Sequence, residues 1–275
     1  MKRVSILLIS FLSCINLFAQ SEVQTTDKPS PYKMTFAKDA IITGGGVGLT
    51  LLGYYFITKK DDLTLQQLAI RTRDRVPFFD RGNVGYYSEK ADKDSYIPFN
   101  ASFGYPIVLM LVNGNERSHI GQVAALYLET MSIAGAMFTL SAGLVNRSRP
   151  LVFPGSSATS DFKRSSNNQR SFFAGHTEAT AAASFFAAKV FADFNPDSKA
   201  RTYIWILAAA TPAVTGYLRY KAGMHFLSDN LLGYALGAAT GILVPQLHKT
   251  KLMQNVSIVP QAGINTRGLA VVYRF

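Results

Sequence analysis

Charged residues are placed along the chain so that they leave six long, nearly uncharged stretches. Two of the stretches contain one acidic residue each, Glu129 and Glu178, and the other four contain none. An α-helix needs roughly 20 residues to cross the hydrocarbon core of a bilayer. The pattern therefore predicts an all-α membrane bundle of about six transmembrane helices, at Ala40–Thr58, Ser95–Asn115, Ser118–Asn146, Ser171–Ala188, Thr202–Leu218 and Asn230–His248.

The first 19 residues have the layout of a secretory signal. Lys2 and Arg3 precede an apolar run, Val4–Phe18, and the small residue Ala19 is followed by polar chain. This order of positive, apolar and small residues is typical of a cleaved signal peptide. We expect cleavage after Ala19, and an uncleaved signal anchor is the alternative. Polar residues 20–38 indicate a flexible lead-in to the helical domain, residues 39–249.

Two further segments depart from the pattern of long apolar helices. Residues 59–94 are rich in charge, and Leu63, Leu65, Leu68 and Ile70 supply an apolar face at helical spacing. We interpret this segment as an amphipathic helix on the membrane surface. In residues 250–275, an apolar run at residues 256–259 precedes a glycine-containing turn, after which Leu269, Val271, Tyr273 and Phe275 occupy alternate positions. This pattern predicts a short C-terminal β-hairpin.

Composition agrees with a chain that partly faces lipid. Hydrophobic residues make up 48% of the 275 residues and charged residues only 16%, against about 25% charged in ordinary soluble domains. The formal net charge of +11 favours an anionic partner. Because no basic stripe lies on a polar domain, nucleic acid is excluded, and membrane lipids or an anionic substrate remain. The single cysteine, Cys14, excludes an intrachain disulfide, and no CxxC pair is present to hold zinc.

Polar clusters lie at three ends of the predicted helices, where membrane proteins seldom keep charge without a function. No membrane crossing separates the first two clusters, and two crossings separate the second from the third. All three clusters are therefore predicted to lie on one side of the membrane. They are Arg147-Ser148-Arg149-Pro150 after the third helix, Gly175-His176-Thr177-Glu178 at the start of the fourth, and Arg219, His225 and Asp229 between the fifth and sixth.

These residue types suit phosphoryl transfer. Arginines bind phosphate oxygens through forked, charge-assisted hydrogen bonds, and amides opening a helix after Gly175 would face the anion. If His225 and Asp229 share a helical face, the carboxylate can hold one ring nitrogen and aim the other at phosphorus. His176 remains to protonate the leaving oxygen. Positioning and charge neutralisation are most of what the reaction needs, so the set requires no metal and no cofactor.

The three clusters resemble the type-2 phosphatidic acid phosphatase superfamily, which shows K-x6-R-P, P-S-G-H and S-R-x5-H-x3-D. The resemblance covers roughly residues 95–248. The matching residues are Arg149-Pro150, then Phe173-Ala174-Gly175-His176, then Leu218-Arg219 with His225 and Asp229. The resemblance implies a helical bundle in which His225 forms a phosphohistidine and Arg149 and Arg219 bind phosphate. Ala142 and Ala174 stand where the family has lysine and serine, and we consider Arg147 as a substitute for the lysine.

The resulting expectation is a phosphatase acting on a lipid phosphate: a phosphatidate, phosphatidylglycerophosphate, an isoprenyl diphosphate or lipid A. The alternatives are a periplasmic non-specific phosphatase and a phosphate-binding membrane protein with little catalysis, and the oligomeric state is left open. The family usually places its site at the periplasmic face of the inner membrane, whereas the basic segment 59–81 favours the cytoplasmic side by the positive-inside rule; we follow the family.

Other ionisable residues receive simpler interpretations. His119 and His248 fall at predicted helix ends, where an interfacial position is expected. Glu129 lies inside the third predicted helix. We expect it to pair with a basic group of the site or to face other helices.

Overall fold

The computed structural model describes residues 29–249, 256–263 and 266–273. The predicted signal segment, residues 1–19, lies outside the described residues, and so does the lead-in before residue 29. The elements are α2 (Phe36–Thr58), α3 (Leu65–Ala69), η1 (Arg73–Arg75), η2 (Phe78–Asn83), α4 (Glu89–Val112), α5 (Gly114–Arg117), α6 (Ile120–Leu144), η3 (Pro150–Val152), α7 (Ser160–Arg164), η4 (Ser166–Gln169), α8 (Gly175–Phe194), α9 (Ala200–Lys221), α10 (Leu227–Leu247), β1 (Val256–Gly263) and β2 (Thr266–Tyr273).

Each of the six predicted helices coincides with a long helix: α2, α4, α6, α8, α9 and α10. Within the described part of the chain, only α2, α4, α6 and α10 are long and apolar enough to cross a membrane. Four such helices indicate a membrane protein, and the other two predicted spans, α8 and α9, are not apolar enough to meet this measure. The reason is that α8 carries Glu178 and Lys189, and α9 is diluted by threonine, tyrosine and proline.

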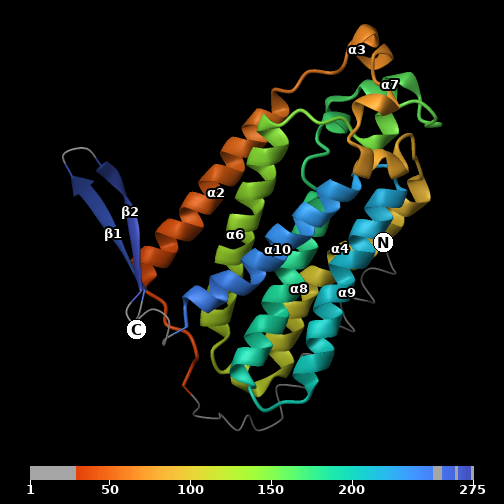
Figure 1. The fold of residues 1–275 in the computed structure, drawn as a ribbon. Coiled ribbons are helices and arrows are strands. Elements are labelled where there is room, and N and C mark those ends of the chain that lie inside the picture. The colour runs from red at the N-terminus through yellow and green to blue at the C-terminus, as the bar shows by residue number, and fades with distance from the viewer. Residues whose placement is uncertain (1–28, 250–255, 264–265, 274–275) are drawn as a thin grey trace, which may run out of the picture.

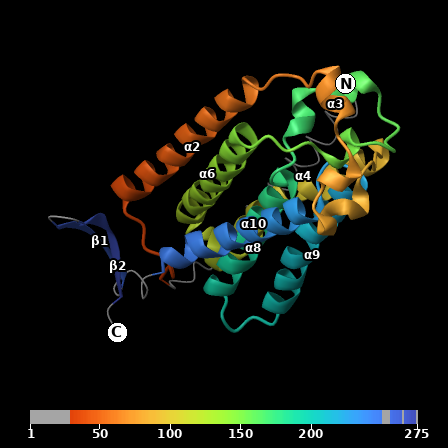
Figure 2. The ribbon, with the colours of Figure 1, turned by 45° about the horizontal axis from the view of Figure 1, so that its top comes forward.

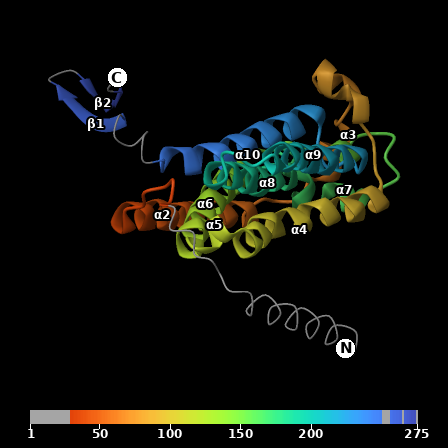
Figure 3. The same cartoon turned by 90° about the horizontal axis from the view of Figure 1, so that it is seen from below.

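The bundle is built around α8. Seventeen of the 20 residues of α8 are buried, and α10, α9, α4 and α6 all pack against it. Seen from below, α8 lies between α9 and α10 on one side and α4 on the other (Figure 3). Helix α2 lies outside this group beside α6 (Figure 1). Its apolar side chains, Leu51 and Ile41 among them, are mostly exposed, as expected for a surface that contacts lipid.

Glycines let α10 approach α8 closely. A Cβ atom on Gly233 would lie 2.6 Å from the carbonyl oxygen of Ala174, and one on Gly237 would lie 2.1 Å from that of Glu178. Gly241 meets Ala182 in the same way, at 2.5 Å. Small residues at this four-residue spacing are how membrane helices bring their backbones together. The close contact fixes the start of α10 against the start of α8.

One end of the bundle is closed by short elements. In two orientations, α3 and α7 lie at the same end as the start of α10 (Figures 1 and 2). Buried apolar residues from these connections, including Leu63, Val76, Leu151 and Phe226, pack together as one cluster. The long amphipathic helix predicted for residues 59–94 is wrong, because only Leu65–Ala69 and the start of α4 are α-helical there. The segment folds inward instead and buries polar residues beneath the loop that precedes α10.

The C-terminal part of the chain contains two antiparallel strands. Strand β1 pairs with β2 in a register that runs from Val256 opposite Tyr273 to Gly263 opposite Thr266. The tight turn predicted near Asn265 falls at residues 264–265, outside the described residues. The described lead-in ends earlier than predicted, because α2 already begins at Phe36.

A substitution at Gly237 should test the close packing of α10 on α8. The Gly237→Val change forces a Cβ into the 2.1 Å contact with the Glu178 carbonyl, and overpacking a tight contact costs about 1–3 kcal/mol or more. We expect a lower thermal unfolding midpoint in detergent. Gly48→Ala is the matched control, since a Cβ there meets nothing within 4 Å, and it should leave the midpoint unchanged or higher. Equal midpoints for both variants would contradict the assigned packing.

Candidate active site

A small cavity of about 180 Å³ lies at the closed end of the bundle. It receives side chains from the loop after α6, the segment before α8, the first turn of α8 and the loop between α9 and α10. The structure thus brings the three polar clusters to one place, as the crossing count predicted. The lining residues are Phe138, Arg149, Asn167, Arg170, Gly175, His176 and His225.

His225 is buried on the loop that joins α9 to α10. Its Nδ1 lies 2.7 Å from the carbonyl oxygen of Ser171. A carbonyl can only accept a hydrogen bond, so Nδ1 carries the proton and Nε2 carries a lone pair. Burial, with Arg219 and Arg149 nearby, holds the pKa of the His225 imidazole well below its usual range. The ring is therefore neutral at physiological pH, and Nε2 can act as a nucleophile.

Asp229 does not occupy the position that the sequence predicted for it. Helix α10 begins at Leu227, so His225 precedes the helix and the two residues do not share a helical face. Among the hydrogen bonds of the described residues, none joins Asp229 to His225. The carboxylate instead accepts from the Ser171 hydroxyl at 2.6 Å and from the Phe226 amide at 3.0 Å. Asp229 thus holds the two chain segments that flank the imidazole, and the Ser171 carbonyl orients the ring.

Arg147 is also placed differently from the prediction. Its guanidinium forms an ion pair with Asp229 and donates to Asp80 at 2.6 Å. The same group lies over the Phe226 ring, 4.7 Å from the centroid. These contacts occupy Arg147 outside the cavity, so it does not replace the family lysine as a phosphate ligand. Its role is to bind the carboxylate that fixes the start of α10.

Two buried residues of η2, Asp80 and Asn83, were missed by the sequence analysis. Asp80 accepts hydrogen bonds from the backbone amide of Ser228 at 2.9 Å and from its hydroxyl at 2.7 Å. Asn83 donates to the carbonyl oxygens of Tyr220 and His225, at 3.0 and 2.9 Å. Both side chains are fully buried. Together they fix both ends of the loop that carries His225. In the sequence, both residues lie in a charged segment without a clear pattern, which gave no signal that they would be buried.

Gly223 is required at the sharpest point of that loop. Its φ is +72°, in the left-handed region, and a Cβ there would lie 1.9 Å from the carbonyl oxygen of Tyr86. Glycine alone adopts this conformation without a steric penalty. The backbone of residues 220–226 can therefore reverse direction within a few residues and present His225 to the cavity.

Three arginines surround the histidine with unpaired donors. The Nε groups of Arg149, Arg219 and Arg170 are buried and have no hydrogen-bond partner in the described structure. Burial, with Arg219 and Arg170 nearby, lowers the pKa of Arg149 to about 9. Among the described residues, Arg219 alone of the three forms an ion pair with an acidic side chain, Asp92 of α4. Unpaired buried donors are rare in native proteins and call for an explanation, and an anion held between these groups supplies one.

Arg170 was not among the predicted site residues. It lines the cavity and donates to Asn167, which lines it as well. Its backbone pairs with that of Arg147 in an isolated parallel bridge, so the segment before α8 lies against the loop after α6. Arg170 comes six residues before His176, but without the fold nothing in the sequence separated it from a surface arginine.

His176 stands in the first turn of α8 and contacts aromatic rings of α4. The Phe99 ring centroid lies 4.5 Å from that of the imidazole, and Tyr96 lies at 5.0 Å. The preceding glycine is needed for packing, because a Cβ on Gly175 would lie 2.4 Å from the Phe138 ring. Amides in the first turn of a helix have no partners inside the helix. Those of Gly175 and His176 therefore lie beside the cavity with the positive end of the helix dipole.

Comparison with known proteins gives one match. The family model of the PAP2 superfamily matches residues 123–253. This region of the chain belongs to the PAP2 superfamily. No match was found among curated proteins or among solved structures.

Membership of the PAP2 superfamily supports phosphatase activity on phosphate esters. The matched region, residues 123–253, contains every cavity-lining residue, from Phe138 to His225. Asp80, Asn83 and Asp92, which hold the PAP2 site in place, come from the part of the chain before that region. Ala142 and Ala174, at the positions where the sequence departs from the family motifs, are both fully buried and do not line the cavity. Arg170, which lines the cavity, is an additional positive charge that the family motifs do not include.

Removal of Asp80 should unfold the site. The Asp80→Ala change leaves Arg147 with one carboxylate and strips the Ser228 amide and hydroxyl of their acceptor, and breaking a buried ion pair costs about 3–5 kcal/mol. We expect the thermal midpoint to fall clearly in detergent. Asp94→Ala is the control, because its pair with Lys90 is exposed and such pairs contribute about 0–1 kcal/mol. A midpoint for Asp80→Ala as high as that of the control would contradict this assignment.

Proposed function

We propose that the protein hydrolyses the phosphate of a membrane lipid through a phosphohistidine at His225. The observation that carries the proposal is the group of three arginines, Arg149, Arg219 and Arg170, whose unpaired Nε–H donors are buried around a neutral imidazole. A tetrahedral dianion would accept hydrogen bonds from these donors and offset their mutual repulsion. The superfamily supports the phosphatase class, and the lipid substrate is inferred from a neighbouring apolar groove.

In the first step, Nε2 of His225 attacks phosphorus. The N–P bond forms while the bond between phosphorus and the leaving oxygen breaks. His176, which takes up a proton once the bound phosphate dianion offsets the charges of Arg149 and Arg219, gives that oxygen its proton. Arg149, Arg219 and Arg170, with the first amides of α8, bind the equatorial oxygens. Such donors are worth roughly 10²–10³-fold in rate each where they meet developing charge, so Arg170 can compensate for the lysine and serine that the chain lacks.

In the second step, water replaces the imidazole. His176, now neutral, takes a proton from the water as its oxygen attacks phosphorus, the N–P bond breaks, and inorganic phosphate leaves. Asp229 contacts neither substrate nor nucleophile in this scheme. It is a positioning residue, since it holds Ser171 and Phe226, and the Ser171 carbonyl keeps the proton of His225 on Nδ1.

An apolar groove of about 550 Å³ beside the site supports a lipid substrate. It lies along α9 and α10, and its lining includes Thr177, Tyr220 and Asn230, the residues directly after His176, Arg219 and Asp229. Thr177 donates to Asn230 at 2.8 Å, and Gly216 packs on both. We infer that an acyl or isoprenyl chain lies in this groove while its phosphate occupies the cavity.

The proposal also assigns a location. Helices α8 and α9 complete a six-helix unit within the membrane, with α8 shielded from lipid by its neighbours. The amino-terminal segment, residues 1–19, directs the chain to the cell envelope, and the site faces the periplasm from the inner membrane, where membrane lipids deliver the substrate.

Phosphate release from a panel of lipid phosphates tests the reaction. We expect the purified protein in detergent to release phosphate from at least one of phosphatidate, phosphatidylglycerophosphate, isoprenyl diphosphate and lipid A. His225→Ala should lower the rate by at least about 10³-fold, since removing a nucleophile costs up to ~10⁶-fold. His119→Ala, at the opposite end of the bundle, is the matched control and should keep full activity.

The intermediate provides a second readout of the same proposal. Brief incubation with radiolabelled p-nitrophenyl phosphate should label the His176→Ala variant, whose slowed second step retains the phosphoryl group, and the label should be acid-labile. His225→Ala should take up no label. If the folded protein binds phosphate but releases none from any substrate, the phosphatase proposal is wrong and the protein is a phosphate-binding membrane protein. Release from p-nitrophenyl phosphate alone would replace the lipid substrate by soluble esters.

Filling the groove should separate lipid from soluble substrates. Ala213 lines the groove, whereas Val214, the next residue on α9, does not. We expect Ala213→Phe to raise KM for the preferred lipid phosphate by about tenfold or more, since a blocked chain loses apolar contact worth ~0.8 kcal/mol per CH₂ group. The rate on p-nitrophenyl phosphate should not change. Val214→Phe should alter neither substrate, and equal lipid KM values for the two variants would rule out the groove as the chain-binding site.

A further inference from the structure

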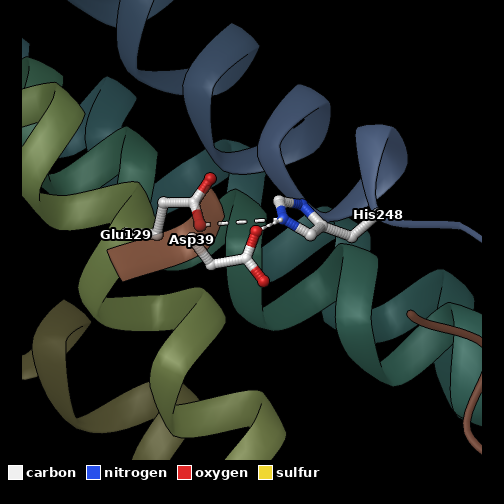
Figure 4. Close-up of side chains that lie close together, drawn as sticks. All are labelled: Asp39, Glu129 and His248. Atoms are coloured by element: carbon white, nitrogen blue, oxygen red, sulfur yellow. Dashed lines mark hydrogen bonds and ion pairs between the residues drawn. The ribbon is translucent and has the colours of Figure 1, made fainter. Parts of the chain in front are cut away.

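A second group of ionisable side chains is buried at the end of the bundle opposite the cavity. Asp39 lies in the first turn of α2, Glu129 lies in α6, and His248 directly follows α10. Helix α2 ends at the other side, where Lys60 donates to the Val145 carbonyl beyond α6 at 2.6 Å. The three side chains point toward one another from three helices (Figure 4). His248 is therefore buried between helices rather than exposed at an interface, and Glu129 faces other helices, the second of the two expectations for it, rather than a basic group of the site.

The imidazole of His248 presents a lone pair to two carboxylates. Its Nδ1 lies 2.8 Å from the Val244 carbonyl oxygen, which can only accept, so Nδ1 carries the proton. In the neutral ring, Nε2 then has none. Yet Nε2 lies 3.2 Å from Oδ1 of Asp39 and 3.6 Å from Oε2 of Glu129. Three electron-pair donors then face one another, and they repel unless a metal cation or a second ring proton lies between them.

Glu129 gives an independent indication of a missing partner. Its side chain is only 3% exposed, and its Oε2, aimed at His248, has no hydrogen-bond partner among the described residues. By contrast, the second oxygen of Asp39 accepts from the Thr35 amide at 2.7 Å, which fixes the direction of its Oδ1. A buried carboxylate oxygen without a donor is costly, so the site is built for a positive ligand.

We infer that Asp39, Glu129 and His248 bind a divalent metal ion, with Zn²⁺ as the ion that suits them best. Ligand atoms about 2.1 Å from a tetrahedral ion lie about 3.4 Å apart, close to the 3.2 and 3.6 Å separations here. All three ligand atoms lie within 4.8 Å of one another. Imidazole nitrogen and carboxylate oxygen are both ligand types that zinc takes, and water would complete the coordination.

The surroundings of the cluster fit a metal site. The hydrogen bond from Nδ1 to a backbone carbonyl is the outer contact that metal-binding histidines usually make. A groove of about 490 Å³, lined by Asp39 together with Met34, Phe36 and Gln122, gives a path from the surface. The ion would join α2, α6 and α10, and the backbone amide of Lys33 donates to the His248 carbonyl at 2.8 Å beside it. Its effect is on the stability of the bundle, away from the phosphate chemistry.

Zinc binding by the detergent-purified full chain tests the inference without reference to activity. After chelator treatment and removal of the chelator, the wild-type protein should bind close to one Zn²⁺ per chain by calorimetry, and its thermal midpoint should rise with added zinc. Glu129→Gln and His248→Gln should each weaken binding by more than the ~10–100-fold that loss of an outer contact costs. Matched controls are Glu116→Gln and His119→Gln, which lie at the same end outside the cluster and should bind as the wild type does.

Circular dichroism and size-exclusion chromatography on each variant separate loss of binding from loss of fold, and the wild-type titration decides the question even if a variant does not fold. Co²⁺ as a probe should give a visible absorption band in the wild type that Zn²⁺ abolishes and that Glu129→Gln lacks. No binding to the folded wild type, or equal binding by Glu129→Gln, would overturn the metal site and leave a protonated histidine between two carboxylates.

Discussion

The ion pair between Arg147 and Asp229, with Asp80 on the other side of the guanidinium, is the interaction on which the site depends. It joins the loop after α6, the first turn of α10 and the short helix η2, three segments far apart in the chain. Buried charges are costly unless every member is paired, and here each carboxylate has further donors. Because the network is complete, the loop between α9 and α10 has a single position, and His225 is held against the Ser171 carbonyl.

The two ends of the bundle contrast in their charge balance. At the cavity, buried guanidinium groups exceed the acidic groups that face them, so the site favours an anion. At the opposite end, two carboxylates meet one imidazole, so that cluster favours a cation. Both imbalances are buried, where electrostatic interactions are weakly screened. Helices α6 and α10 connect the two ends. Helix α6 carries Glu129 and leads into the loop with Arg149, and α10 begins beside the cavity with Asp229 and ends at His248.

In the proposed mechanism, catalysis relies on groups that do not touch the reacting atoms. Asp229, Asp80 and Asn83 bind backbone groups near His225, and Arg147 holds the two carboxylates in place. The aromatic rings of α4 limit where His176 can lie. Preorganised donors and a fixed nucleophile are the main requirements for phosphoryl transfer. The superfamily region, residues 123–253, supplies the cavity, while the segment before it supplies much of the support.

The sequence by itself determined the six long helices, through the spacing of charged residues, and the residues that line the cavity from the three clusters: Arg149, Gly175, His176 and His225. The helices follow from local sequence patterns. The grouping of the clusters follows from the count of membrane crossings, because two crossings return the chain to the same side. Only the tertiary structure decided the partners. Four-residue spacing placed Asp229 beside His225, but α10 starts too late for that, and Arg147, predicted to bind phosphate, is bound by two carboxylates. Arg170, Asp80 and the Asp39–Glu129–His248 cluster depend on contacts between distant segments, which no local pattern encodes.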